Sequence, residues 1–363
     1  MNRIVKLGVV GCGAIAQHHL KHATGNEGIE VVAVADVREE AARATAAKFG
    51  IAHAYTDAEE LFDNPEVEGV ILALQTRFRT ELALRAFAKG KHVLLEKPAA
   101  MNADEVRRMI AGRGALSAGC CSSRFRFFAS AVAAAEFVRS GALGELRLLR
   151  SRNLAPATPP KDPPLAWQYS REANGGGVLA DWGVYDLDYL LGITGWTLRP
   201  EHVFARVWYV PPAFESFIAA GSDGETHVSA TIACQGGPLI SYERGALQAA
   251  KREHAWQLVG TNGSLDLYLL PQEEKEIVFH AASKAEGVVS RTIWKGTESW
   301  AAVHAGPVVD FAASIREGRQ PSTSLEHALT VQEIVDAIYM SSESGGLIAV
   351  RPVDYVDEEV RTQ

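Results

Sequence analysis

The segment "GVVGCGAIA", residues 8–16, carries glycines at positions 11 and 13 and an alanine at position 16, directly after an apolar, β-branched run. Glycine permits the tight turn between a strand and a helix. The next glycine lets a pyrophosphate approach the backbone N–H groups at the helix N-terminus. Gly11, Gly13 and Ala16 therefore form the GxGxxA pattern typical of a dinucleotide-binding turn.

An acidic residue twenty positions later completes this pattern. The apolar run "VVAVAD" ends at Asp36, where a carboxylate can accept hydrogen bonds from both hydroxyls of an adenosine ribose. In the alternative interpretation, the glycines only make a turn and Asp36 caps the following helix, but the complete order of features favours a dinucleotide. Because Asp36 would repel a 2′-phosphate, we expect NAD rather than NADP, while Arg38 leaves NADP open.

Strand-like and helix-like segments alternate through the first third of the chain. The strand-like segments, separated by amphipathic helical patterns, are "IVKLGVV", "IEVVAVAD", "VEGVILAL", "KHVLLEK" and "ALSAGCCS". Continuously apolar strands are typical of a parallel sheet that helices cover on both faces. We predict an α/β protein whose residues 1–123 form a Rossmann NAD-binding domain.

The pattern changes after residue 123. Segments of alternating polarity at 202–210, 226–234, 238–246, 255–269 and 276–281 predict antiparallel strands, and helical patterns occur at 306–318 and 324–345. Residues 124–363 are therefore predicted to form a C-terminal α+β domain with an open, mainly antiparallel sheet that binds the substrate. A proline-rich stretch at 154–167 is expected to be a loop over the site.

Composition excludes several classes of partner. The net charge is −8 and no block of basic residues suggests nucleic acid or an anionic membrane surface. No segment approaches the ~20 apolar residues of a membrane span. The cysteines lack CxxC spacing and the histidines lack metal-ligand spacing, so no metal is predicted; His18, His19 and His22 are expected at the surface. We expect a cytoplasmic protein with a small-molecule substrate.

The segment "HVLLEKPAA", residues 92–100, is a buried strand that ends on a charged pair. In a doubly wound sheet, ligands bind beyond the carboxyl ends of the strands, so Glu96 and Lys97 would lie near the nicotinamide. Pro98 cannot continue the strand's hydrogen-bonding ladder, and its fixed φ would aim the lysine. Without the Rossmann context, the same residues would be a surface ion pair.

A second glycine cluster, "GGGVLADWGVYDLD", occupies residues 175–188. The glycines would let the backbone approach the cofactor, and Asp181 and Tyr185, four residues apart on a helix, would share one face. A phenol with a pKa of ~10 is a poor base at neutral pH, so catalysis by Tyr185 requires a nearby cation such as Lys97 to lower that pKa. In the alternative interpretation, Tyr185 packs in the core and Asp181 caps the helix.

These motifs together make the chain resemble the Gfo/Idh/MocA oxidoreductases over nearly its whole length. The resemblance rests on GxGxxA with Asp36, "EKP", "SRF" at 123–125, "NGGGVLADWGVYDLDYL", "GTNGSL" and "PSTSLEHALTVQEIVDAIYMSSESG". It implies hydride exchange between a nicotinamide and a CH–OH group of a sugar, polyol or glycoside, with Lys97, Tyr185 and Asp181 as catalytic residues. It also implies a homo-oligomer, dimer or tetramer, formed through the open sheet.

The resemblance extends to contact residues. It implies that the cofactor contacts Gly11, Gly13, Ala14, Ile15, Asp36, Val37, Arg38, Leu74, Gln75, Thr76, Glu96, Lys97 and Trp167. It implies that the substrate contacts Lys97, Arg124, Arg126, Trp167, Asp181 and Tyr185. Gln75, Thr76, Arg77 and Thr80 depart from the Thr-Pro-Asn and histidine of many relatives, so contacts there are carried over less directly.

Two questions about the reaction stay open at this level. The same residues would serve a hydrolase or lyase that oxidises a sugar transiently, expels a substituent and returns the hydride; a non-catalytic sensor is disfavoured by the retained Lys97, Asp181 and Tyr185. Arg124, Lys161 and other cations of the second domain (Arg152, Arg171, Lys251, Arg252 and His254) could bind an anionic group on the substrate, or could be a solvated face.

Overall fold

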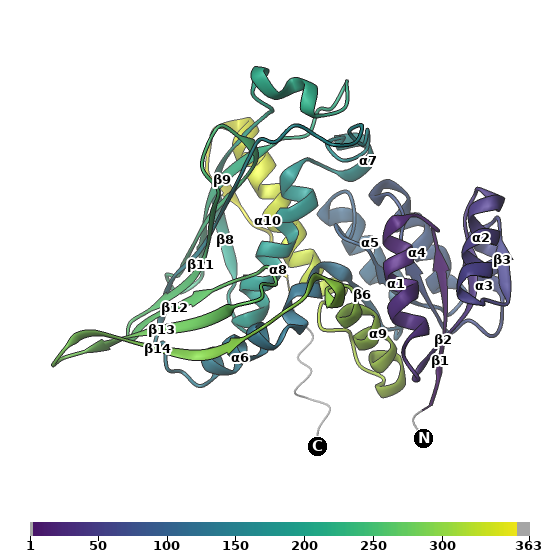
Figure 1. Ribbon diagram of the computed structural model, residues 1–363, viewed down its shortest axis with the longest axis horizontal. Helices are drawn as coiled ribbons and strands as arrows, with labels where there is room; N and C mark the ends of the chain where they lie inside the picture. The colour runs from purple at the N-terminus through teal and green to yellow at the C-terminus, as the bar shows by residue number, and fades with distance from the viewer. Residues whose placement is uncertain (1–2, 354–363) are drawn as a thin grey trace.

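Two sheets organise the chain in the computed structural model, which describes residues 3–353, with helices on and between them (Figure 1). The first sheet has six parallel strands in the order β3-β2-β1-β4-β5-β6. They are β1 (Val5–Val10), β2 (Ile29–Ala35), β3 (His53–Tyr55), β4 (Gly69–Leu72), β5 (His92–Leu95) and β6 (Ala118–Cys120). This order is that of a Rossmann fold, and its switch point lies between β1 and β4.

Helices cover both faces of this sheet, as the apolar strands require. They are α1 (Ala14–Thr24), α2 (Glu39–Phe49), α3 (Ala58–Asp63), α4 (Arg79–Ala88) and α5 (Ala103–Arg113). α9 (Ala305–Glu317), from late in the chain, packs with Leu7 and Ile71 through Val308 and Phe311. Residue 123 thus separates the two sheets along the chain, while α9 returns to the Rossmann sheet in space.

The second sheet has nine strands in the order β14-β13-β12-β11-β7-β10-β9-β8-β15. They are β7 (Leu146–Pro156), β8 (Pro200–Trp208), β9 (His227–Cys234), β10 (Leu239–Gln248), β11 (Glu253–Gly260), β12 (Gly263–Leu267), β13 (Lys275–Ser283), β14 (Gly287–Gly296) and β15 (Ile348–Ala349). Only the β7–β10 pair is parallel, so the predicted mainly antiparallel sheet is confirmed.

One face of the second sheet is covered by α6 (Ala129–Arg139), α8 (Val184–Ile193) and α10 (Leu325–Ser344), which lie between it and the Rossmann domain (Figure 1). The short α7 (Arg171–Asn174) lies near one end of the sheet. No helix covers the outer face of the sheet in this view. The inner face and its helices share one hydrophobic core, so the edge where the two domains meet is rigidly supported.

The sequence analysis did not predict β3, β14 or β15. β14 is an edge strand whose residues are mostly exposed, so it lacks the alternating burial that identifies a half-buried strand. The helix predicted after the glycine cluster begins with a π-helical turn, Leu179–Gly183, before α8. Such turns change the angular spacing of side chains and occur frequently at functional sites.

Within residues 3–353, no helix has both the length and the apolar content that a bilayer crossing requires.

Candidate active site

The glycine turn after β1 is shaped for close approach to the backbone. Gly11 has a φ of +92°, and a Cβ there would collide with the carbonyl of Ala73. Gly13 is the N-cap of α1 and contributes no side-chain cap, and the first turn, which includes Ala14 and Ile15, contains no acidic residue. The N–H groups at this helix end are therefore suited to bind an anion such as a pyrophosphate.

Asp36 lies at the carboxyl end of β2 and joins this turn. Its carboxylate accepts hydrogen bonds from the Cys12 N–H (2.9 Å) and the Arg38 N–H (2.9 Å). Beside it is a cavity of about 490 Å³, whose lining includes Gly11, Asp36, Val37, Leu74, Gln75 and Phe78. The lining also carries Asp57, Glu81, Arg77 and Arg85. Apolar side chains beside the strand-end carboxylate of Asp36 fit an adenosine, so the predicted residues fit NAD.

Thr76 and Trp167, two further predicted cofactor contacts, are not among the residues that line the cavity beside Asp36. The Thr76 hydroxyl is buried and donates to Asn174 Oδ1 at 2.8 Å, which links the two domains. Trp167 lies in the turn before α7 and is 41% exposed. Their contacts with the cofactor stay predictions.

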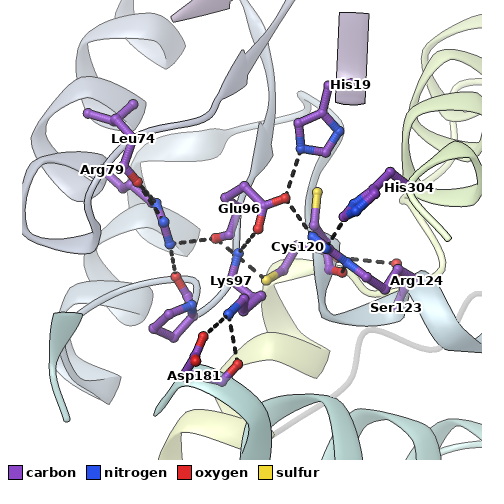
Figure 2. A network of polar contacts seen from close by, with 12 residues as sticks. His19, Leu74, Arg79, Glu96, Lys97, Cys120, Ser123, Arg124, Asp181 and His304 are labelled. Atoms are coloured by element: carbon purple, nitrogen blue, oxygen red, sulfur yellow. Dashed lines mark hydrogen bonds and ion pairs between the residues drawn. The ribbon is translucent and has the colours of Figure 1, made fainter. Parts of the chain in front are cut away.

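Glu96, at the end of β5, is a buried anion at the centre of a polar network (Figure 2). Its carboxylate accepts from Arg124 Nη2 (2.6 Å), His19 Nε2 (2.8 Å) and the Lys97 backbone N–H (3.0 Å). Burial alone would raise the pKa of the Glu96 carboxyl, but Arg124, His19 and Arg79 hold it well below its usual range. Glu96 therefore fixes the backbone that presents Lys97, and is not a surface ion-pair partner.

This network corrects one prediction. His19 was expected at the surface but is fully buried, because α1 turns it toward Glu96. Two predicted substrate contacts are engaged within the chain: the Arg124 guanidinium is buried against Glu96 and bonds His304 Nδ1 at 2.9 Å. Arg126 pairs with the buried Asp188 at 2.6 Å and bonds the Ser322 carbonyl, and the substrate contacts of both arginines stay predictions.

Arg79 was missed by sequence reasoning. It is buried and donates to the Leu74 carbonyl (2.8 and 2.6 Å), the Glu96 carbonyl (2.7 Å) and the Pro98 carbonyl (Figure 2). It thereby ties the end of β4 to the end of β5. The segment "TRFRTEL" gives no local signal for this role, because the carbonyls it binds lie on other elements.

Lys97 and Asp181 meet across the two domains (Figure 2). Lys97 Nζ lies 2.5 Å from Asp181 Oδ1 and 2.7 Å from the Asp181 carbonyl oxygen, and both side chains are largely but not fully buried. The Lys97–Pro98 peptide bond is cis. Nζ also lies 5.1 Å from the centre of the Tyr185 ring, so the three predicted catalytic residues form one cluster.

The electrostatics of Tyr185 differ from the expectation. Burial raises the pKa of its hydroxyl well above the ordinary value, and the cation that opposes this is Arg124, 5.0 Å from the ring centre, rather than Lys97. The phenol therefore stays protonated at neutral pH. It can donate a hydrogen bond or relay a proton, but it does not supply a phenolate base.

The glycines at 175–177 serve packing within the chain. A Cβ on Gly176 would collide with the Tyr339 hydroxyl, and one on Gly177 would collide with the backbone of Glu225. The buried Glu225 carboxylate accepts from the N–H groups of Gly177 and Leu179, both at 2.8 Å. The prediction that these glycines admit the cofactor is thus replaced by a role in seating the π-helical turn that carries Asp181.

Some of the cations predicted to face the substrate are paired with carboxylates, while Lys161, Lys251 and Arg252 are exposed. Arg152 pairs with Glu243 (2.8 Å) and Glu253 (3.0 Å), and Arg171 pairs with Glu343 (3.3 Å). Together with the pairing of Arg124 and Arg126, this removes the basis for an anionic substrate at those four arginines.

Two family models match this chain in succession. "Oxidoreductase family, NAD-binding Rossmann fold" covers residues 5–114, and "GFO/IDH/MocA C-terminal domain" covers residues 131–266. The chain belongs to the Gfo/Idh/MocA oxidoreductase family. As a member of that family it is an NAD-binding oxidoreductase, which agrees with the turn and cavity described above.

Several members of the family are similar over most of this chain. "Uncharacterized oxidoreductase ORF334" of Rhizobium meliloti is 29% identical over 360 residues, which is 94% of this chain and 98% of that protein. Myo-inositol 2-dehydrogenase of Thermotoga maritima is 31% identical over 202 residues, 55% of this chain and 58% of that protein. Levoglucosan dehydrogenase of Pseudarthrobacter phenanthrenivorans is 22% identical over 343 residues, which is 85% of this chain and 86% of that protein.

Solved structures of the Gfo/Idh/MocA type share the fold. Levoglucosan dehydrogenase in complex with NADH and L-sorbose superposes with a TM-score of 0.84 at 20% identity, over 97% of this chain and all of that one. The aldose-aldose oxidoreductase from Caulobacter crescentus, complexed with glycerol, superposes with a TM-score of 0.79 at 20% identity, over 96% of this chain and all of that one.

Proposed function

We propose that this protein is an NAD-dependent dehydrogenase that oxidises a CH–OH group of a sugar, polyol or glycoside. The observation that carries the proposal is the cluster of Lys97, Asp181 and Tyr185 at the carboxyl end of β5. This cluster lies at the edge of the Rossmann sheet where ligands bind. Relatives named as myo-inositol and levoglucosan dehydrogenases support the same class of substrate.

Each residue of the cluster has a distinct role in this proposal. The Lys97 ammonium, held by Asp181, donates to the substrate oxygen and stabilises the negative charge that develops there as the carbinol is oxidised. The Tyr185 phenol accepts the hydroxyl proton while it passes its own proton to a neighbouring acceptor. Glu96 and Asp181 are both close enough to raise the pKa of Tyr185. Because Glu96 is already held by Arg124 and His19, Asp181 is the acceptor we assign.

Bound NAD supplies the hydride acceptor, and the chain supplies its position. The glycine turn and the N-terminus of α1 would hold the pyrophosphate, and Asp36 would hold the adenosine ribose. Overall, the carbinol loses a hydride to the nicotinamide and a proton to the relay. The carbonyl product leaves, and Asp181 then releases the proton to solvent, which returns the protein to its starting state.

A sugar screen with two readouts tests the proposal. We would follow NADH and nitrophenol separately, with free sugars and nitrophenyl glycosides, at stoichiometric and at trace NAD. Accumulation of NADH without nitrophenol supports the dehydrogenase. Release of nitrophenol over many turnovers per NAD would replace it with a hydrolase, and no reaction with any carbohydrate would refute both.

Lys97→Met gives the residue-level test. We expect turnover to be abolished while NAD affinity changes by less than about tenfold, because the pyrophosphate is held by the glycine turn and not by Lys97. The matched control is Lys89→Met, whose ammonium pairs with Asp63 on the surface. Near-wild-type turnover of Lys97→Met would remove Lys97 from the mechanism.

We propose in addition that the outer face of the second sheet joins two copies of the chain. Phe204 and Trp208, both 46% exposed, and Leu239, 40% exposed, lie on this face. Apolar groups of this size on an uncovered sheet are typical of an interface. Light scattering after gel filtration should give a multiple of 39.2 kDa. Trp208→Glu should reduce this mass, and Ile4→Glu, at an exposed residue of the Rossmann domain, should not; a monomeric wild type would refute the interface.

A further inference from the structure

Three strands of the second sheet carry a matched row of polar side chains on the inner face. Arg244 of β10 is the register partner of Asn153 of β7, and His254 of β11 is the partner of Asn153 on the other side. Because register partners on one face lie side by side, the three side chains form a continuous row. We call Arg244, Asn153 and His254 the polar row.

The polar row stands out from the rows beside it. The next row on the inner face, two residues away on each strand, consists of Tyr242, Ser151 and Trp256. The row after that consists of Ile240, Leu149 and Leu258, and all six residues are buried. The face thus changes from fully apolar to fully polar toward one end. Polar side chains at the end of a hydrophobic core need hydrogen-bond partners, which either the core or a ligand can supply.

Arg244 is already satisfied by a buried carboxylate. It pairs with Asp186 of α8 at 2.5 and 2.8 Å, and Asp186 also accepts from Trp256 Nε1 at 3.1 Å. The charge of this guanidinium is therefore compensated within the core. The polar row as a whole does not present the net positive charge that would select an anionic ligand.

Asn153 and His254 keep unused hydrogen-bonding capacity. Asn153 is 3% exposed, and none of the hydrogen bonds found within residues 3–353 uses its side-chain amide. His254 Nδ1 is buried without a hydrogen-bond partner. Burial first, and then the charges of Arg252 and Arg244, lower the pKa of the His254 imidazole, so it offers one donor and one acceptor at neutral pH. Buried polar groups of this kind need a partner.

The polar row is continuous with the catalytic cluster. The Trp182 ring lies 5.3 Å from the Arg244 guanidinium and 5.7 Å from the Tyr185 ring. Asp181 is close enough to act electrostatically on Arg244. Trp182 and Arg244 therefore connect the catalytic cluster to Asn153, and a ligand extended from Lys97 past Trp182 would approach Asn153 and His254.

We propose that Asn153 and His254 bind hydroxyl groups of the substrate remote from the reacting carbon, and that they make the site selective for a neutral carbohydrate over its carboxylate counterpart. This rests on the proposed dehydrogenase function and deepens it. An amide and a neutral imidazole match the donors and acceptors of sugar hydroxyls, and the indole of Trp182 offers an apolar surface beside them.

The kinetic test compares Asn153→Ala and His254→Ala with wild type, using the best neutral sugar from the screen. We expect KM for the sugar to rise about tenfold or more, with kcat changed less than about threefold and KM for NAD unchanged. His254→Gln, which keeps a donor and an acceptor, should recover most of the loss, and His202→Ala, at an exposed histidine of β8, should have no effect. A sugar KM within twofold of wild type in both alanine variants would overturn the proposal.

Charge selectivity is tested with D-glucose and D-glucuronate, which differ at one carbon. We expect wild type to bind glucose more tightly in saturation-transfer NMR with NADH present, and His254→Ala to lose glucose binding by about tenfold. Tighter binding of glucuronate would refute the neutral-ligand assignment. If sugar binding depends on Asn153 and His254 but no turnover occurs, the dehydrogenase is refuted and the role of the polar row is supported. If turnover occurs and does not change when either residue is replaced, the role of the polar row is refuted and the dehydrogenase is supported.

Discussion

Neutralising the buried Glu96 carboxylate should destabilise the whole protein. Two charged or potentially charged donors, Arg124 and His19, lie 2.6 and 2.8 Å from its oxygens, and the Lys97 N–H lies 3.0 Å away, out of solvent. Removing one partner of a buried ion pair costs ~3–5 kcal/mol, because the other charge stays buried without compensation. Glutamine can still accept one of these bonds, so we expect a loss of ~3 kcal/mol for Glu96→Gln and ~5 kcal/mol for Glu96→Ala.

The assay is urea unfolding followed by tryptophan fluorescence and circular dichroism, with Asp63→Asn as the control. Asp63 pairs with Lys89 at 2.5 Å on the surface, and such exposed pairs contribute ~0–1 kcal/mol. The double variant Glu96→Gln, Arg124→Met should lose less than the sum of the two single variants, since it removes both charges of the closest ion pair. Equal losses for Glu96→Gln and Asp63→Asn would refute the reasoning.

The pH dependence of this difference follows from the depressed pKa of Glu96. A carboxyl whose folded pKa lies below its unfolded value stabilises the protein above the unfolded pKa, and that contribution is lost as pH falls through the folded pKa. The stability gap between wild type and Glu96→Gln should therefore be constant from pH 8 to 5 and shrink only below about pH 4. A gap that closes between pH 7 and 5 would show that another group is responsible.

Three further predictions follow from single contacts. Asp36→Asn should raise NADP affinity relative to NAD by about tenfold in fluorescence titrations, because the repulsion of a 2′-phosphate is removed; an unchanged ratio would mean that Arg38 sets the preference. Tyr185→Phe should lower kcat/KM by about 100-fold without removing an ionisation from its pH profile between 6 and 9, since the phenol is already protonated there; loss of such an ionisation would make Tyr185 a base. Gly177→Ala should lower the free energy of unfolding by ~2 kcal/mol or more, because the new methyl group meets the Glu225 backbone, and a neutral result would contradict that packing.

The fold and the cofactor edge could be predicted because their signals are local in sequence. The GxGxxA turn, Asp36 and Lys97 each follow a strand directly, and the parallel topology brings the strand ends to one edge. The same logic fails for β14, whose exposed residues carry no alternating pattern.

The electrostatics of the site could not be predicted because they depend on long-range contacts. Glu96 is held by His19 and Arg124, and His304, far along the chain, joins them through Arg124. The burial that raises the pKa of Tyr185 comes from the packing of two domains, and no local pattern reports it. Arg152, one of the cations predicted to face a substrate, is paired with carboxylates on both neighbouring strands.

The return of α9 to the Rossmann sheet constrains how the protein is made. Val308 and Phe311 fill a core with Leu7 and Ile71, residues translated long before them. During synthesis, the nucleotide-binding half therefore leaves the ribosome with part of its apolar surface uncovered, until β7 to β14 of the second sheet have followed. A fragment that stops at residue 123 would expose the same surface, and we expect it to aggregate or to be degraded in cells, rather than serve as an independent nucleotide-binding module.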